Sequence, residues 1–159
     1  MVRAMVADEP PPVVLFDGVC GLCNAAVQFI VRHDPLGRFH FAPLQSELAR
    51  RILIRHGRNP GDLDTMYLVI GADTPHERLL AKSDGLLAVL HGLGGRWRLL
   101  SLARFLPRAL RDRGYDRLAR NRYRWFGRAE QCTVPGPDIR ARFVDRASET
   151  AKRGEIGVP

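Results

Sequence analysis

The stretch VVLFDGVCGLCNAAVQFI, residues 13–30, decides the fold of this chain. Its first four residues, 13–16, form a continuous apolar and partly β-branched run, which is typical of a buried strand. Asp-Gly then favours a turn, and the apolar residues that follow Cys20 and Cys23 fall at helical spacing. The pattern therefore predicts a strand, a turn and a helix, with a Cys-x-x-Cys pair where the strand passes into the helix.

The rest of the chain predicts further strands and helices around this unit. Further strands are expected at residues 38–43, 65–70 and 77–82, the last two as an antiparallel hairpin. Helices are expected at 44–57, at 85–93 with Ser83 or Asp84 as its cap, and at 96–106 and 115–126 on either side of Pro107. We expect one domain over residues 13–132, with helices alone from about residue 96. Residues 1–12 are expected to be disordered and residues 133–159 to form a loosely attached polar tail.

The expected order β-α-β-α-β-β-α, followed by a helical extension, is that of an α/β thioredoxin-like fold. In that fold a Cys-x-x-Cys also lies where the first strand turns into the first helix. The fold class alone does not establish a function, so the cysteines need their own argument.

Two cysteines three residues apart at the start of a helix lie on one face, one turn from each other, and can form a disulfide. The free N–H groups and the helix dipole favour a thiolate at the first position. Cys20 is therefore the expected nucleophile, and Cys23 the expected resolving thiol that releases a mixed disulfide. Such an exchange requires no cofactor.

Other readings of the cysteines stay open at this point. A zinc-binding module could use Cys20, Cys23 and Cys132 with a histidine, although a structural zinc site usually has its four ligands in closely matched pairs. The cysteines could also be a structural pair of small buried residues, and we expect Cys132 to be an ordinary free thiol.

Composition narrows the class of protein. The chain has 159 residues, 45% hydrophobic and 26% charged, which suits one soluble globular domain. No apolar run is long enough for membrane insertion, and the N-terminus does not resemble a secretory signal, so a cytoplasmic location is expected. The net charge of +8 comes almost entirely from arginine. It allows an Arg-rich nucleic-acid-binding protein as a third reading, which ranks below the other two.

The residues also carry a family resemblance. DGVCGLC at 17–23 resembles the D-x-x-C-x-x-C signature of the DCC-type thiol–disulfide oxidoreductases. FAPLQS at 41–46, KSDGLLAVLHGLGG at 82–95 and YDRLARNRYRWFG at 115–127 resemble further family motifs in unbroken order. The resemblance implies a thioredoxin-like domain, a Cys20–Cys23 redox pair and disulfide exchange with a disulfide-containing protein or small thiol. It names neither the substrate nor the reductant that restores the dithiol.

Several residues near the dithiol or inside these motifs are candidates for the site. Asp17 could act as a general base for Cys23, or it could shape the strand-to-helix turn. Candidates for substrate contact or for support of the site are Gly18, Val19, Phe41, Pro43, Gln45, Asn121 and Arg122, with core packing preferred for Phe41. Where thioredoxins keep a cis-proline facing the dithiol, this chain has Asp64 and Thr65.

The arginine-rich segment 115–126 interleaves aromatic residues and arginines, a pattern that also occurs in nucleic-acid-binding proteins. We interpret it instead as an amphipathic helix with solvated arginines. The stripe expected to pack on the domain consists of Tyr115, Leu118, Ala119, Arg122, Tyr123 and Phe126.

Overall fold

The computed structural model describes residues 9–128 and 137–144. They contain a four-stranded sheet in the order β2-β1-β3-β4. Strand β1 (Val13–Phe16) runs parallel to β2 (His40–Pro43) and antiparallel to β3 (Tyr67–Ile70), which forms a hairpin with β4 (Arg78–Ala81). The predicted strands and the antiparallel hairpin are confirmed, although β2 and β3 each begin two residues later than expected.

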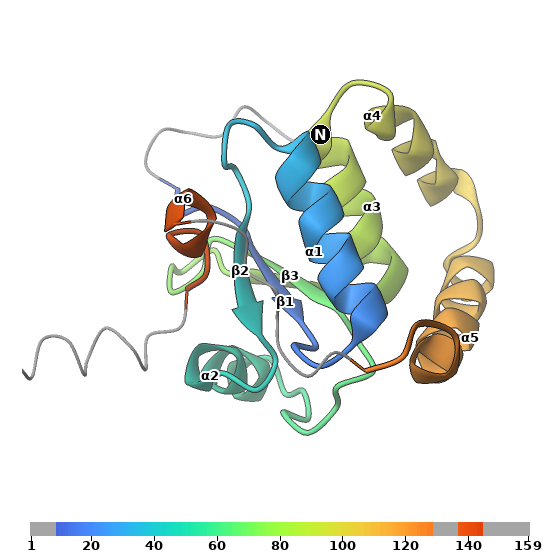
Figure 1. Ribbon diagram of the computed structural model, residues 1–159, viewed down its shortest axis with the longest axis horizontal. Coiled ribbons are helices and arrows are strands. Elements are labelled where there is room, and N and C mark those ends of the chain that lie inside the picture. The colour runs from blue at the N-terminus through green and yellow to red at the C-terminus, as the bar shows by residue number, and fades with distance from the viewer. Residues whose placement is uncertain (1–8, 129–136, 145–159) are drawn as a thin grey trace, which may run out of the picture.

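Helices cover both faces of the sheet (Figure 1). α1 (Gly21–His33) and α3 (Lys82–Leu93) lie on one face, and α2 (Glu47–Arg55) lies on the other. Successive residues of a strand point to opposite faces. Val13 and Leu15 therefore pack in a core with α2, whereas the residues that alternate with them face α1 and α3.

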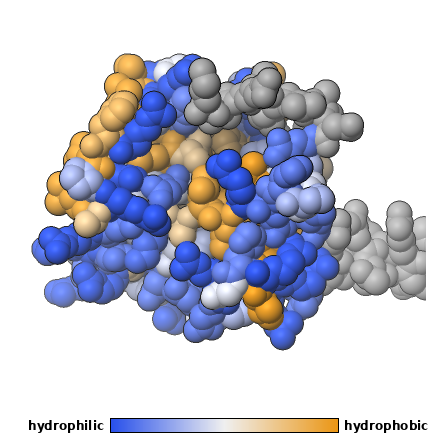
Figure 2. All heavy atoms as spheres, turned by 180° about the vertical axis from the view of Figure 1, so that it is seen from behind, coloured by the Kyte–Doolittle hydropathy of each residue, from blue (hydrophilic) through white to orange (hydrophobic). Residues whose placement is uncertain are grey.

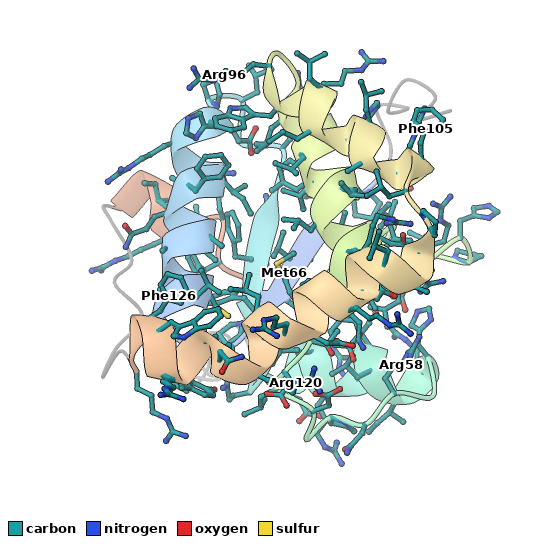
Figure 3. All side chains as sticks on the ribbon, turned by 90° about the vertical axis from the view of Figure 1, so that its right-hand side faces the viewer. Arg58, Met66, Arg96, Phe105, Arg120 and Phe126 are labelled. Atoms are coloured by element: carbon teal, nitrogen blue, oxygen red, sulfur yellow. The ribbon has the colours of Figure 1, made fainter. Side chains whose placement is uncertain are left out.

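The first seven elements follow the order β-α-β-α-β-β-α, so the fold is thioredoxin-like, as predicted. A helical extension follows, which consists of α4 (Trp97–Leu100), the 3-10 helix η1 (Ser101–Phe105) and α5 (Arg108–Phe126). α5 crosses in front of α1 and α3 (Figure 3) and packs against both. It begins directly after Pro107, seven residues earlier than expected, because Gly114 does not interrupt it.

The start of α3 differs from the sequence prediction. Its N-cap is Ala81, which makes no side-chain capping bond, and the two expected caps lie within the first turn. The Ser83 hydroxyl instead donates to the carboxylate of Asp112 in α5. Asp84 accepts a hydrogen bond from Arg111 of α5 at 3.0 Å. Both side chains therefore join two helices, which local sequence alone does not reveal.

The expected stripe on α5 is also only partly correct. Arg122 is buried and Tyr115, Ala119 and Tyr123 are half-buried. Leu118 and Phe126 are 39% and 50% exposed. The inward face of α5 is narrower than a six-residue stripe because the helix crosses α1 and α3 instead of lying along them.

The polar tail needs a correction for its described part, residues 137–144. After α6 (Pro137–Arg140), this segment runs beside β2: Phe41 N–H donates to the Arg142 carbonyl, and Val144 N–H donates to the Phe41 carbonyl, both at 2.8 Å. The Phe143 ring lies 5.4 Å from that of Phe41. This segment is therefore attached, and it covers the outer edge of β2, where a bare strand would invite aggregation. The start of the described chain, residues 9–12, also contacts the sheet, since the Pro12 carbonyl accepts from His40 N–H at 2.9 Å.

Candidate active site

The two cysteines lie at the N-terminus of α1, as the spacing predicts. Cys20 is the N-cap residue, in an extended conformation, and the backbone N–H of Cys23 donates to its Sγ at 3.3 Å. Both residues are free thiols, with Cys20 fully buried and Cys23 half-buried. The Cys20 sulfur thus accepts an N–H bond at the end of α1 where the free N–H groups and the positive end of the helix dipole lie.

The C-terminal end of α5 covers Cys20. Arg128 pairs with Cys20 in an isolated antiparallel bridge, and Gly21 N–H donates to the Gly127 carbonyl at 3.3 Å. A Cβ atom on Gly21 would lie only 2.4 Å from the carbonyl oxygen of Phe126. Glycine between the cysteines is thus required by this close approach of two backbones.

Asp17 is buried at the end of β1, and its carboxylate accepts from four donors. Oδ1 accepts from Val19 N–H at 3.1 Å and from Gln45 Nε2 at 2.9 Å. Oδ2 accepts from Arg122 Nη2 at 3.1 Å and from the Tyr123 hydroxyl. The carboxylate therefore joins the strand-to-helix turn, the loop after β2 and helix α5.

Arg122 is the cation of this network, and only 3% of its surface is exposed. Its Nη2 group also donates to the Leu63 carbonyl at 2.8 Å and lies 3.2 Å from the carboxylate of Asp64. Its Nε, also buried, has no hydrogen-bond partner among the described atoms. The guanidinium thus holds α5 against the loop that precedes β3.

The network shifts the ionisation of its members. Burial alone would raise the pKa of Asp17, but hydrogen bonds from Tyr123, Gln45 and Val19 N–H, together with the Arg122 charge, outweigh it and lower that pKa. Burial, together with the hydrogen bond and charge of the Cys20 sulfur, raises the pKa of Cys23 to about 12, against the opposing effect of Arg122. Cys23 is therefore protonated at neutral pH while Asp17 is ionised.

A small cavity of about 60 Å³ opens beside Cys23. Residues 63–66 form one wall, and Tyr115 and Arg122 from α5 form another. The Tyr115 hydroxyl accepts from Met66 N–H at 2.8 Å, which fixes this wall where α5 crosses α1 and α3 (Figure 3). Asp64 and Thr65, which stand where thioredoxins keep a cis-proline, thus line the same cavity as Cys23.

The other predicted site residues divide into two groups. Gly18 donates its N–H to Gln45 Oε1 at 3.3 Å, and Pro43 lies beside Gly18, so these residues form the rim of the turn with Val19, which is 41% exposed. The peptide bond before Pro43 is trans.

Phe41 and Asn121 are not brought to the site. Phe41 is fully buried in the core with α1 and α3 and has no surface to offer a substrate. Asn121 donates to the Arg117 carbonyl of its own helix at 2.8 Å.

Sequence reasoning missed the contributions of Tyr115 and Tyr123, which it placed on the packing stripe only. One signal was present: the same stripe contained Arg122, and a buried arginine requires anionic or hydrogen-bonding partners.

The metal hypothesis depends on a residue outside the described part of the chain. This residue is Cys132. Within residues 9–128 and 137–144, no group of three His, Cys, Asp or Glu side chains could hold a metal ion. The zinc alternative therefore stays a matter for measurement.

Comparisons with known proteins match most of the chain to one family. A family model described as DCC1-like thiol-disulfide oxidoreductase matches residues 14–128. The Bacillus subtilis protein YuxK is 39% identical over 135 residues, which cover 85% of this chain and 95% of that protein. A DCC family protein of Arabidopsis thaliana, described as chloroplastic, is 36% identical over 128 residues, covering 80% of this chain and 72% of that one. No solved structure gives a significant match.

Proposed function

Because the chain belongs to the DCC1-like thiol-disulfide oxidoreductase family, we propose that it passes electrons between the Cys20–Cys23 dithiol and the disulfides of proteins or small thiols. The observation that best supports this proposal is the hydrogen bond from Cys23 N–H to Cys20 Sγ at the start of α1. It brings the two residues together and favours an anion on the first sulfur.

The exchange has two steps. The Cys20 thiolate attacks one sulfur of the substrate disulfide; the substrate S–S bond breaks, a mixed disulfide forms, and the leaving sulfur departs as a thiolate. Cys23 then loses its proton and attacks Cys20 Sγ, which forms the Cys20–Cys23 disulfide and releases the second substrate thiolate. Two electrons have passed to the substrate. Two equivalents of a reducing thiol, or one dithiol, then reduce the Cys20–Cys23 disulfide by the same exchange and become a disulfide themselves.

The pair of cysteines presents a choice of nucleophile. Exposure favours Cys23, since Cys20 is fully buried. Position favours Cys20, which is the N-cap residue of α1 and accepts the Cys23 N–H on its Sγ, whereas burial and the Cys20 sulfur raise the pKa of Cys23. We assign attack to Cys20 because a protonated thiol is a poor nucleophile. This assignment requires Gly127 and Arg128 to move off Cys20 when substrate binds.

The effect of Cys20 on the pKa of Cys23 also explains how the second step becomes possible. Part of what raises the pKa of Cys23 is the hydrogen bond and charge of Cys20. A mixed disulfide removes that charge, while the Arg122 charge continues to favour a Cys23 thiolate. The resolving thiol is therefore held inactive in the free enzyme and becomes easier to ionise once Cys20 has reacted.

We propose a supporting role for Asp17 instead of general-base catalysis. Its lowered pKa makes it a weak base, and its oxygens already accept four hydrogen bonds. Its negative charge instead anchors Arg122 next to the cavity beside Cys23. The rim of the turn, above all Val19, is the proposed contact for substrate.

We further propose that the protein acts as a reductase in a reducing compartment, such as the cytoplasm. In such a compartment a Cys-x-x-Cys pair rests in the reduced state and forms its disulfide only transiently, during catalysis.

The test is insulin reduction with wild type, Cys20→Ser and Cys23→Ser. Both variants should lose turnover, and only Cys23→Ser should accumulate a mixed disulfide, visible as a mass increase that dithiothreitol reverses. Accumulation in Cys20→Ser alone would reverse the roles of the two cysteines. Absence of turnover in the wild type, with one zinc ion per chain in protein purified without chelator, would refute the redox proposal.

A further inference from the structure

An exposed apolar surface lies on the helical extension, away from the dithiol. Phe105 is 74% exposed and Leu99 is 67% exposed. Figure 2 shows this apolar surface at the upper left, and Figure 3 labels Arg96 and Phe105 near the two ends of the segment that carries it. We define the apolar–basic face by Leu99, Leu100, Leu102, Phe105, Leu106 and Leu110 together with Arg96, Arg98, Arg104 and Arg108.

The charge on this segment has one sign only. Residues 85–111 contain no aspartate or glutamate, whereas all four arginines of the apolar–basic face fall within them. Single exposed apolar residues are common on protein surfaces, but a contiguous exposed apolar surface usually marks an interaction site. The partner of this surface must therefore accept apolar side chains and supply negative charge.

The inner side of the same segment is well packed, so the outward side chains are a fixed feature. The Trp97 ring lies 4.7 Å from that of Phe29 and 5.0 Å from that of His33, both on α1. Ser101 is buried and donates to the Arg98 carbonyl at 2.6 Å. α4 and η1 are thus held on the domain while their leucines and Phe105 face solvent.

A hollow next to the face is suited to an anionic group. It measures about 440 Å³ and is lined by Arg98, Arg104 and His91 among others. Its one carboxylate, Asp84, is paired with Arg108 at 3.2 Å and with Arg111 at 3.0 Å. Arg98 and Arg104 therefore line a hollow whose one carboxylate, Asp84, is already in ion pairs with two other arginines.

We propose that the apolar–basic face docks on the surface of an anionic phospholipid bilayer. Amphipathic helical segments with Arg on the polar side and Leu or Phe on the other bind in the plane of the interface. The leucines and Phe105 enter between the headgroups, and the arginines contact phosphates while their stems stay in the apolar layer. Within the described residues no helix is both long and apolar enough to span a bilayer, so docking by this face is peripheral.

A second copy of this chain is a poorer occupant. In a two-fold dimer the same surface meets itself, so Arg96, Arg98 and Arg104 would oppose their own copies. The two carboxylates next to the face, Asp84 and Asp112, are already paired with Arg108. Arginines brought together across such an interface would repel one another. A bilayer that carries negative headgroups has the opposite sign and needs no matching shape.

The experiment is vesicle co-sedimentation of the full chain. Vesicles of phosphatidylcholine alone are compared with vesicles that contain one third phosphatidylglycerol, at low salt and at 0.5 M NaCl. We expect binding to the mixed vesicles only and its loss in high salt. Inorganic phosphate at millimolar concentration should not compete, since the apolar contact needs the bilayer.

Matched variants separate the two contributions. The double variant Leu99→Ser/Phe105→Ser should weaken binding at least tenfold, whereas Leu36→Ser, at a position 72% exposed on the loop after α1, should leave it unchanged. Arg98→Gln/Arg104→Gln should weaken it about 25-fold, from roughly fivefold per arginine at an anionic surface.

Insulin reduction and the thermal midpoint should be unchanged in all three variants, which shows that they are folded. Cys20→Ser should bind as wild type does, so failure of the redox proposal leaves this one standing.

Three results would overturn the proposal. One is equal binding to neutral and anionic vesicles, another is binding that the Leu99→Ser/Phe105→Ser variant retains, and the third is no binding at all. If sedimentation showed a wild-type dimer that this variant converts to monomer, with no binding to vesicles, the face would be a contact between copies of the chain.

Discussion

Replacing Asp17 by Asn tests the buried ion pair that joins the end of β1 to helix α5. The Asp17 side chain is fully buried and that of Arg122 is 3% exposed, with Nη2 and Oδ2 3.1 Å apart. Asn keeps the shape, so no cavity opens, but it leaves the guanidinium as an uncompensated buried charge. Removing one partner of a buried pair costs about 3–5 kcal/mol of unfolding free energy. We expect the lower end of that range, about 3 kcal/mol, because Asp64 also faces Arg122 at 3.2 Å.

The chain offers a matched control at that second carboxylate. Asp64→Asn removes the same charge from the same guanidinium, but the Asp64 side chain is 69% exposed. An exposed pair of this kind contributes about 0–1 kcal/mol. Urea unfolding at pH 7, followed by circular dichroism, should therefore separate the two variants clearly. If Asp17→Asn cost no more than Asp64→Asn, the buried pair would not hold α5 on the domain.

The pH dependence gives an independent check. The pKa of Asp17 is lowered in the folded chain from an ordinary value of 3.8. Burial alone would raise it, but three hydrogen bonds, from Tyr123, Gln45 and Val19 N–H, and the Arg122 charge outweigh the burial. A lowered pKa contributes stability above the unfolded value and loses it as the pH falls through the folded value. The difference in stability between wild type and Asp17→Asn should therefore be constant from pH 7 to about pH 5 and shrink below about pH 4. A difference that stayed constant to pH 2 would contradict the ionised state of Asp17.

Two further substitutions test the packing around the site. Gly21→Ala should lower the thermal midpoint and expose the Cys20 thiol to alkylation, because the alanine Cβ would lie 2.4 Å from the Phe126 carbonyl oxygen. At Gly114 an added Cβ has no atom within 4 Å, so Gly114→Ala should instead stabilise α5 by up to about 1 kcal/mol. Phe143→Ala should cost about 2–3 kcal/mol in urea unfolding, less than a fully buried phenylalanine, since its half-buried ring packs 5.4 Å from that of Phe41. Unchanged unfolding in the Phe143 variant would show that the segment beside β2 contributes no stability.

Local patterns were enough to predict the part of the fold that carries the dithiol. The apolar run of β1, the Cys-x-x-Cys pair and the helix that follows are neighbours in sequence, so their geometry follows from periodicity and helix-end chemistry. The hairpin β3–β4 was predictable for the same reason, because a short turn joins two strand-like runs. The order of these elements then restricted the fold to very few topologies.

The supporting contacts of the site were beyond such patterns because they connect distant segments. Asp17 and Arg122 are 105 positions apart, and the segment beside β2 begins almost a hundred residues after it. Asn121 and Arg122 belong to one motif, yet only Arg122 contacts Asp17. Arg122 lies seven residues after Tyr115 and three after Ala119, so it shares their inward face of α5. The covered state of Cys20 also could not be read from sequence, because the cover is the backbone of Gly127 and Arg128 rather than a side chain.

The ion pair between Asp17 and Arg122 has a consequence for how small this enzyme can be. A truncated chain that ended after α3 would keep the four described strands and the Cys20–Cys23 pair. Its Asp17 carboxylate would lose its only ion-pair partner among the described residues, Arg122, together with the Tyr123 hydroxyl, and one side of the cavity beside Cys23 would be missing. Burying an unpaired charge is costly enough to unfold a domain of marginal stability. The helical extension is therefore part of the minimal folding unit, and fusion partners or affinity tags should be attached beyond it, not in place of it.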